Sequence, residues 1–173
     1  MSREVRRVPG NWQHPTSDGL ESISLFDGID YEPRLRRWDT GAAKWAEGLR
    51  EDWNGGWQPL EPDEVGQTFE EWWGPRPLEE DFMPRWTDAE RTHLMMYETC
   101  TEGSPISPAF ETPEDLARWL ADNGASAFGH QTASYESWLA TIGAGWAPSA
   151  LVTPQTGWTS GVEAMASISG ASA

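Results

Sequence analysis

Cysteine is almost absent from the sequence, since Cys100 is the only one among 173 residues. A single cysteine excludes a disulfide framework within the chain. The histidines are only His14, His93 and His130, and no spacing among these side chains resembles a zinc motif. Basic residues are also scarce, at 12 against 28 acidic ones, so the net charge is −16. This balance argues against direct binding to nucleic acid or to an anionic membrane, because such binding needs a basic face.

Long apolar runs are missing as well. No stretch approaches the length of about 18 residues that predicts a membrane span. The opening MSREVRRVPG is charged but has no apolar core, so it does not predict a secretory signal. We therefore expect a soluble chain inside the cell.

Tryptophan, in contrast, is abundant, at 12 of 173 residues, well above its ordinary frequency. Because each buried indole removes a large apolar area from water, these side chains can build a core. Proline and glycine are also frequent, at 13 and 17 residues, and they favour turns and irregular segments. The composition predicts a folded protein with extended parts rather than a disordered acidic tail.

The negative charge is densest in one stretch. Residues 1–50 hold eight basic and eight acidic side chains, whereas residues 51–81 hold ten acidic and one basic, and residues 82–173 hold ten acidic and three basic. The acidic stretch 51–81 also carries four tryptophans: Trp53, Trp57, Trp72 and Trp73. We expect an acidic, Trp-rich N-terminal region over residues 1–86 that packs on a core domain at 87–166, with a flexible tail at 167–173.

The N-terminal region begins with prolines and glycines, which predict an extended arm over about thirty residues with a short strand at 22–26. Pro33 then favours the start of a helix. That helix has one apolar stripe at helical spacing, formed by Leu35, Trp38, Ala42, Trp45 and Leu49.

Two local motifs follow this helix. The sequence Asn54-Gly55-Gly56 is a turn signal that either ends the helix or makes a tight hairpin. Thr68 and Glu71 have the spacing of a capping box for a short helix at 69–73, which the following Gly-Pro pair would end.

The C-terminal half has a more regular pattern. A second capping box at Thr87 and Glu90 predicts one helical turn before a strand at 92–101. Helices are expected to begin after Thr112 and near Ser134, and strands are expected at 150–153 and within 157–165. The fold class is then α+β, with a β-α-α-β unit and a small sheet. The expected core consists of Leu94, Met96, Leu116, Trp119, Leu120, Trp138, Leu139 and Ile142.

No motif in the chain predicts catalysis. The set of Cys100, His93 and His130 is better explained by a buried cysteine and two histidines at the surface or in loops. Gly143-Ala144-Gly145 follows a helix, which is the wrong context for a phosphate-binding loop. Neighbouring carboxylates usually form a solvated face. We therefore expect no enzymatic activity, no cofactor and no metal.

The acidic stretch has two interpretations that the sequence leaves open. It is either a solvated face that keeps an aromatic-rich protein soluble, or a surface that mimics nucleic acid and docks on a basic protein. In the second case the side chains that bind the partner are eight acids and three tryptophans: Glu61, Asp63, Glu64, Glu70, Glu71, Glu79, Glu80, Asp81, Trp57, Trp72 and Trp73.

Four segments of the sequence are distinctive: EGSPISP at 102–108, which is the most specific, TPEDLARWL at 112–120, GWAPS at 145–149 and RRVP at 6–9. These segments resemble uncharacterised small proteins encoded by tailed phages and prophages. The resemblance implies a viral accessory protein, and it implies no reaction and no catalytic residues.

From charge and resemblance together, we expect a phage protein that binds and inhibits a host defence protein, such as an anti-CRISPR or anti-restriction protein. Its partner would be a basic, nucleic-acid-binding protein in the cytoplasm of the infected bacterium. The alternative is a small-molecule binder that sequesters a nucleotide immune signal between aromatic walls. Its phosphate partners would be Arg85, Arg91 and Arg118. A structural component of the virion is a third possibility, for which the sequence shows no oligomerisation pattern.

Overall fold

The chain forms two compact units. A computed structural model describes residues 2–19, 21–99, 103–153 and 157–170. The larger unit combines residues 1–25 with 85–173, and the smaller unit is 26–84. Both contain helices and small antiparallel sheets, which confirms the α+β class. The expected boundary at residue 86 is wrong for the N-terminus, because residues 1–25 fold with the C-terminal half.

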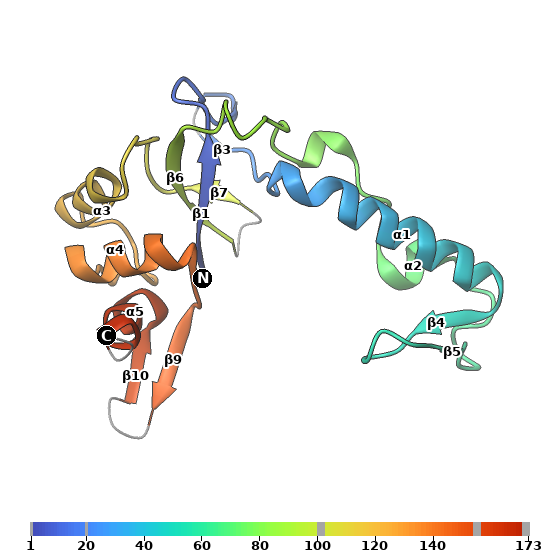
Figure 1. Cartoon of the computed structure of the whole chain (residues 1–173). Helices are drawn as coiled ribbons and strands as arrows, with labels where there is room; N and C mark the ends of the chain where they lie inside the picture. The colour runs from blue at the N-terminus through green and yellow to red at the C-terminus, as the bar shows by residue number, and fades with distance from the viewer. Residues whose placement is uncertain (1, 20, 100–102, 154–156, 171–173) are drawn as a thin grey trace. The chain divides into compact units, whose positions relative to one another are not determined.

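The larger unit contains most of the strands (Figure 1). These are β1 (Arg3–Val8), β2 (Thr16–Ser17), β3 (Glu21–Ser22), β6 (His93–Glu98), β7 (Ser104–Pro105), β8 (Trp146–Ala147), β9 (Ala150–Thr153) and β10 (Gly157–Ser160). Its helices are α3 (Pro113–Asp122), α4 (Tyr135–Ala144) and α5 (Gly161–Gly170).

The smaller unit is built on one long helix. Its helices are the short turn η1 (Gly28–Asp30), α1 (Tyr31–Ala46), α2 (Phe69–Trp73) and the short turn η2 (Glu79–Asp81). Its hairpin consists of β4 (Leu49–Glu51) and β5 (Trp57–Pro59).

The first strand lies inside the main sheet of the larger unit, whose order is β7-β6-β1-β8. β1 runs antiparallel to β6, with Arg3 opposite Glu98 and Val8 opposite His93. The expected extended arm is therefore wrong over residues 3–8. The sequence did not predict this strand, because its charged side chains are typical of a solvent-exposed segment. Arg3 is nevertheless fully buried, and its guanidinium donates to the Ser126 carbonyl at 2.8 Å.

Strand β6 was predicted correctly, although it is shorter than the expected range 92–101. The single turn before it is confirmed, because both the backbone N–H and the hydroxyl of Thr87 donate to the Glu90 carboxylate at 2.7 Å. Both faces of the strand are covered, since Leu94 to Tyr97 are all buried. Cys100, expected on the same strand, lies outside the described residues.

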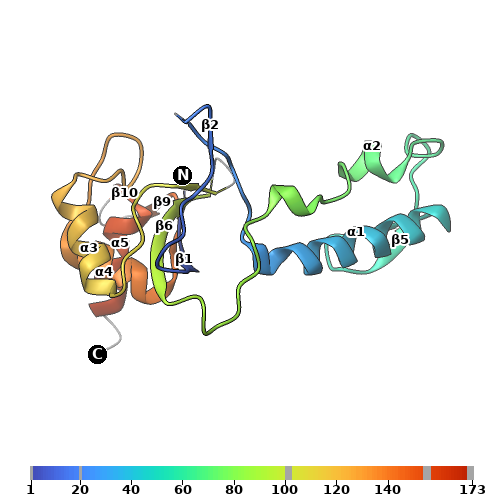
Figure 2. The same cartoon turned by 90° about the horizontal axis from the view of Figure 1, so that it is seen from above.

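Helices α3, α4 and α5 lie together on one side of this sheet, as both views show (Figures 1 and 2). The core between the helices and the sheet confirms six of the eight expected residues: Leu94, Met96, Leu116, Leu120, Trp138 and Ile142. The other two, Trp119 and Leu139, are only half-buried and pack against the edge of this core.

Both predicted helix starts are confirmed. The hydroxyl of Thr112 accepts the N–H of Asp115 at the start of α3. The hydroxyl of Ser134 accepts the N–H of Ser137 at the start of α4. The end of α4 is also as expected, because Gly145 has a φ of 84°, in the left-handed region that favours glycine.

The C-terminal segment differs from the prediction. Strand β10 ends at Ser160, and residues expected to continue the hairpin or to form the tail belong to helix α5, which extends to Gly170. Ser160 starts this helix by accepting the N–H of Glu163 at 3.2 Å. The signal was present as a Ser-x-x-Glu capping box. Residues 171–173 lie outside the described part of the chain.

In the smaller unit, α1 and α2 pack through aromatic rings. Phe69 on α2 contacts both Trp38 and Trp45 on α1, with ring centroids 5.3 and 5.9 Å apart. Gly41 permits this approach, because a Cβ there would lie 2.4 Å from the Phe69 ring. The predicted helix began too late, since Pro33 is its third residue, and ended too late, since Leu49 belongs to β4.

Both local motifs in this unit are confirmed. The Asn54-Gly55-Gly56 turn makes the hairpin, in which Glu51 lies opposite Trp57 and the Asp52 N–H donates to the Gly56 carbonyl at 2.8 Å. Gly55 has a φ of 78°, which explains the glycine. The capping box at the start of α2 is complete, since Thr68 and Glu71 bond to each other reciprocally.

Trp119 is half-buried and Trp138 is fully buried, so the loss of each side chain should lower the stability by a different amount. We expect Trp138→Ala to lower the free energy of unfolding by about 3–5 kcal/mol, as for a buried large aromatic. Trp119→Ala should cost about 2 kcal/mol or less, because part of its ring stays in water. Chemical denaturation of the two variants measures both values. Equal losses would contradict the burial difference between the two sites.

Candidate functional site

All eleven side chains predicted to bind a partner belong to the smaller unit. Seven of the eight acids are exposed, namely Glu61, Asp63, Glu70, Glu71, Glu79, Glu80 and Asp81. Five of these, Asp63, Glu70, Glu79, Glu80 and Asp81, make no ion pair through their side chains within the described residues.

Glu64 is a correction to the predicted surface. Its exposed fraction is 7%, and its carboxylate has three partners. It accepts the Trp72 Nε1–H at 3.0 Å and the Glu61 backbone N–H at 2.7 Å, and it pairs with Arg50 at 3.2 Å. Because a buried charge needs such partners, Glu64 stabilises this unit and presents no charge to a partner.

Two of the exposed acids also have partners within the chain. Glu61 pairs with Arg50 at 2.8 Å. Hydrogen bonds from the backbone and the hydroxyl of Thr68 lower the pKa of Glu71, because they stabilise its ionised form. These two carboxylates are therefore less available to a partner than the five without ion pairs.

The three predicted tryptophans are partly structural. Trp72 is half-buried and contacts Trp45, with centroids 4.9 Å apart, while Trp73 stacks on Phe69 at 6.0 Å. Trp57 and Trp73 still expose 39% and 41% of their surface. Sequence reasoning left out Trp53, which is fully exposed at 104%. Its position directly before the Asn-Gly-Gly turn is the signal that could have indicated this.

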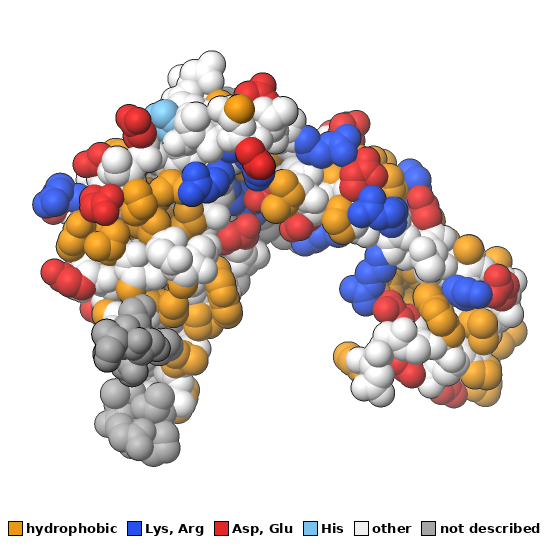
Figure 3. Space-filling view, in the orientation of Figure 1, with side chains coloured by type: hydrophobic (Ala, Val, Ile, Leu, Met, Phe, Trp, Pro, Cys, Tyr) orange, Lys and Arg blue, Asp and Glu red, His pale blue; other side chains and the backbone are white. Residues whose placement is uncertain are grey.

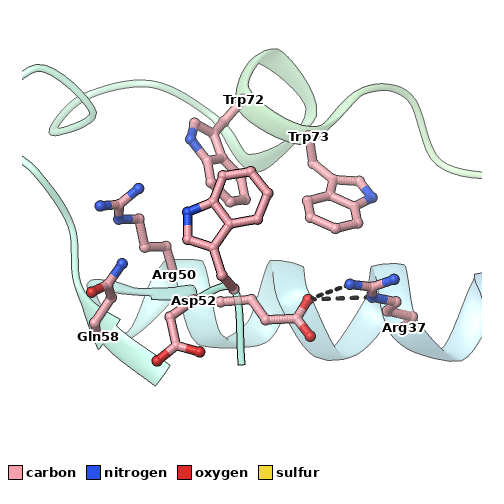
Figure 4. A pocket seen from close by; sticks show the side chains of 8 residues that line it. Arg37, Arg50, Asp52, Gln58, Trp72 and Trp73 are labelled. Atoms are coloured by element: carbon pink, nitrogen blue, oxygen red, sulfur yellow. Dashed lines mark hydrogen bonds and ion pairs between the residues drawn. The ribbon is translucent and has the colours of Figure 1, made fainter. Parts of the chain in front are cut away.

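A pocket of about 450 Å³ lies beside these tryptophans (Figure 4). Helix α1, the β4–β5 hairpin and helix α2 all contribute to it. The lining residues are Arg37, Arg50, Glu51, Asp52, Trp53, Gln58, Trp72 and Trp73. The volume lies in the range of sites for small ligands.

Two arginines line this pocket, and both are already paired. Arg37 on α1 donates twice to the Glu51 carboxylate, at 3.0 and 3.2 Å, and its guanidinium lies 4.9 Å from the Trp73 ring centroid. Arg50 on β4 is held by Glu61 and Glu64. Sequence reasoning missed both arginines, because only the packing of α1 on the hairpin brings Arg37 to this pocket.

Asp52 orders the turn of the hairpin. Its Oδ1 accepts the backbone N–H groups of Asn54 and Gly56, both at 2.8 Å. Its Oδ2 and the Oε1 of Glu51 have no hydrogen bond or ion pair in the described part of the chain. The pocket therefore holds two carboxylate oxygens that can still accept a donor.

The arginines expected to bind phosphate do not line this pocket. Arg85, Arg91 and Arg118 all belong to the larger unit. Arg91 pairs with Asp88, and the Arg118 guanidinium lies 5.2 Å from the Tyr135 ring centroid. Their role as phosphate partners stays a prediction.

Within the described residues, the three histidines do not lie together in a catalytic arrangement. His130 is exposed, and the His93 ring lies against Gly10. Burial lowers the pKa of His14, whose Nε2 donates to the Ile23 carbonyl at 2.6 Å. Among the described residues, no three His, Cys, Asp or Glu side chains lie together in a way that could hold a metal ion.

The fold and the pocket define an acidic α+β protein with a tryptophan-lined pocket. Comparisons of the chain with protein-family models, with curated proteins and with solved structures find no match. The resemblance to phage proteins therefore stays a prediction. Within the described residues, no helix is long and apolar enough to cross a membrane.

The buried carboxylate of Glu64 predicts a large difference from its exposed neighbour Asp63. We expect Glu64→Ala to lower the free energy of unfolding by about 2–3 kcal/mol, because it removes one of the two carboxylates paired with Arg50 and leaves the Trp72 indole N–H without its acceptor. Asp63→Ala should change it by less than about 0.5 kcal/mol. Thermal or chemical denaturation checks both values. A small loss in Glu64→Ala would show that its carboxylate does not hold this unit together.

The capping box predicts a pH effect at Glu71. Since its folded pKa lies below the ordinary 4.5, its contribution to stability is present above that value and is lost as the pH falls through the folded pKa. Thr68→Ala should raise the pKa of Glu71 toward the ordinary value. NMR titration measures this pKa, and Thr40→Ala on α1 is the control that should leave it unchanged. An unshifted pKa in Thr68→Ala would contradict the assignment of its cause.

Proposed function

We propose that the chain is a binding protein whose 26–84 unit docks on a basic protein. This unit has fifteen acidic and six basic residues, a net charge of −9. The observation that carries the proposal is that five of the acids, Asp63, Glu70, Glu79, Glu80 and Asp81, are exposed without an ion pair in the described chain. A solvated face also has such acids, but the exposed tryptophans of the same unit favour an interface.

The exposed tryptophans would supply the apolar contacts of the interface, which the acids cannot make. Trp53, Trp57 and Trp73 expose 104%, 39% and 41% of their surface, and tryptophan is favoured at the energetic centres of interfaces. Figure 3 shows orange, red and blue side chains close together on the surface of this unit. Charge then speeds the encounter, and the aromatic contacts prolong the complex.

For the partner, we propose a host nucleic-acid-binding protein of antiviral defence. A groove that binds phosphates is basic, so carboxylates on a folded scaffold can occupy it. The resemblance to phage proteins points to an inhibitor of such a host system, in the cytoplasm of an infected bacterium. This part rests on analogy and charge, and not on a shared fold.

A second candidate function is the sequestration of a nucleotide signal. The pocket favours it, because three tryptophans and two arginines line one cavity of about 450 Å³. The pairing of these arginines opposes it, since a phosphate would have to displace Glu51 from Arg37, or Glu61 and Glu64 from Arg50. The docking function therefore stands first.

Charge reversal tests the docking function. The tagged chain is used to capture proteins from bacterial lysate, which mass spectrometry identifies, and association rates are then measured at two salt concentrations. We expect basic nucleic-acid-binding proteins that excess duplex DNA displaces. Glu79→Lys with Glu80→Lys should slow association at least about tenfold at low salt.

The matched control reverses two exposed acids of the larger unit, Glu111→Lys with Asp122→Lys, which changes the net charge equally. This control should leave association within about twofold. The docking function fails if the variant at residues 79 and 80 associates as fast as the wild type while folded. It also fails if DNA does not displace the captured proteins.

A further inference from the structure

Three indoles line the pocket of the smaller unit, and that of Trp53 has no aromatic or cationic partner in the described chain. Trp53 makes no ring contact with another described residue and is fully exposed. Trp72 and Trp73, with centroids 5.6 Å apart, form an aromatic wall of the same pocket. Figure 4 shows their rings projecting from α2 toward the side chains of α1 and the hairpin.

The charges of the pocket favour a cation. Its lining has two arginines and two acids, and Glu61 and Glu64 bind Arg50 from outside the lining. The six groups together carry a net charge of −2. Because both arginines are paired, the groups still able to bind a ligand are the Oδ2 of Asp52 and the Oε1 of Glu51.

We propose that this pocket receives the guanidinium group of an arginine side chain from the partner protein. This inference rests on the proposed docking on a basic protein, and it assigns one contact of that interface. A guanidinium stacks on tryptophan faces, and its planar set of N–H donors matches carboxylate oxygens. Trp53 and Trp72 supply the faces, and Asp52 supplies an acceptor.

The chain already contains this chemistry at the edge of the pocket. The guanidinium of Arg37 lies 4.9 Å from the Trp73 ring centroid while it donates to Glu51. An indole and a carboxylate, those of Trp53 and Asp52, also line this pocket, and neither has a cation partner in the described chain. Lysine fits this site less well, because its ammonium is compact and strongly hydrated.

Short peptides test the assignment directly. The probe is acetyl-Gly-Gly-Arg-Gly-Gly-amide, titrated into the full chain while the indole N–H signals are followed by NMR. The same peptide with citrulline, which keeps the shape of arginine without its charge, is the matched control. We expect the arginine peptide to shift the signals of Trp53 and Trp72 and to bind at least about fivefold more tightly than the citrulline peptide.

Two variants locate the site. Asp52→Asn keeps an amide oxygen that accepts the same turn N–H groups but removes the charge, and Trp53→Ala removes an exposed ring that supports no packing. Each should weaken the arginine peptide about fivefold. Trp146→Ala, which removes an exposed tryptophan of the larger unit, should leave the affinity unchanged.

The alternatives give different results. If adenosine monophosphate shifts the signals of Trp53 and Trp72 and the arginine peptide does not, the pocket is a nucleotide site and the proposal is wrong. It is also wrong if neither probe binds, or if the citrulline peptide binds as well as the arginine peptide. If only the arginine contact fails while capture still depends on Glu79 and Glu80, the docking function stands. If the peptide binds but no captured protein is displaced by DNA, the docking function fails and the pocket assignment stands.

Discussion

The buried carboxylate of Glu64 holds the smaller unit together, because it joins three segments that are separate in the sequence. It pairs with Arg50 on β4, accepts the indole N–H of Trp72 on α2, and accepts the backbone N–H of Glu61 in the connecting loop. The hairpin and α2 are thereby fixed relative to each other. Since residues of both elements line the pocket, these bonds help to fix its shape.

Two of the scarce basic residues lie inside the larger unit, and a third is half-buried in the smaller unit. In the larger unit, Arg3 is fully buried beside Glu98, and Arg6 donates to the Leu25 carbonyl at 2.6 Å and stacks over Tyr97. In the smaller unit, Arg50 serves Glu61 and Glu64. With 12 basic residues against 28 acidic ones in the chain, many surface carboxylates stay unneutralised, which is the physical basis of the proposed docking.

The tryptophans divide into two roles in the same way. Trp138 fills the core of the larger unit, and Trp45 lies buried between α1 and α2 in the smaller. Trp53 contributes nothing to either core, and a fully exposed indole on a hairpin turn is costly to keep in water. Its exposure is explained by the proposed binding of an arginine side chain, since Trp53 lines the pocket together with Asp52 and Glu51.

The sequence by itself determined the elements that close through local hydrogen bonds. The starts of α2, α3 and α4 depend on Thr68, Thr112 and Ser134, each of which bonds to a backbone N–H three residues later. The Asn-Gly-Gly hairpin and much of the core stripe are equally local, because helical spacing or turn residues specify them. These features, and the α+β class that follows from them, could be predicted without tertiary contacts.

Only the tertiary structure decided the place of β1, the burial of Glu64 and the composition of the pocket. The partner of Arg3 lies 123 residues away at Ser126, and that of Arg37 lies 14 residues away at Glu51. A charged residue looks solvent-exposed in a sequence until such a partner is known, because burial of its charge depends on groups that distant segments supply. For this reason the acidic stretch could be recognised, but not the arginines and the exposed tryptophan that make part of it a site.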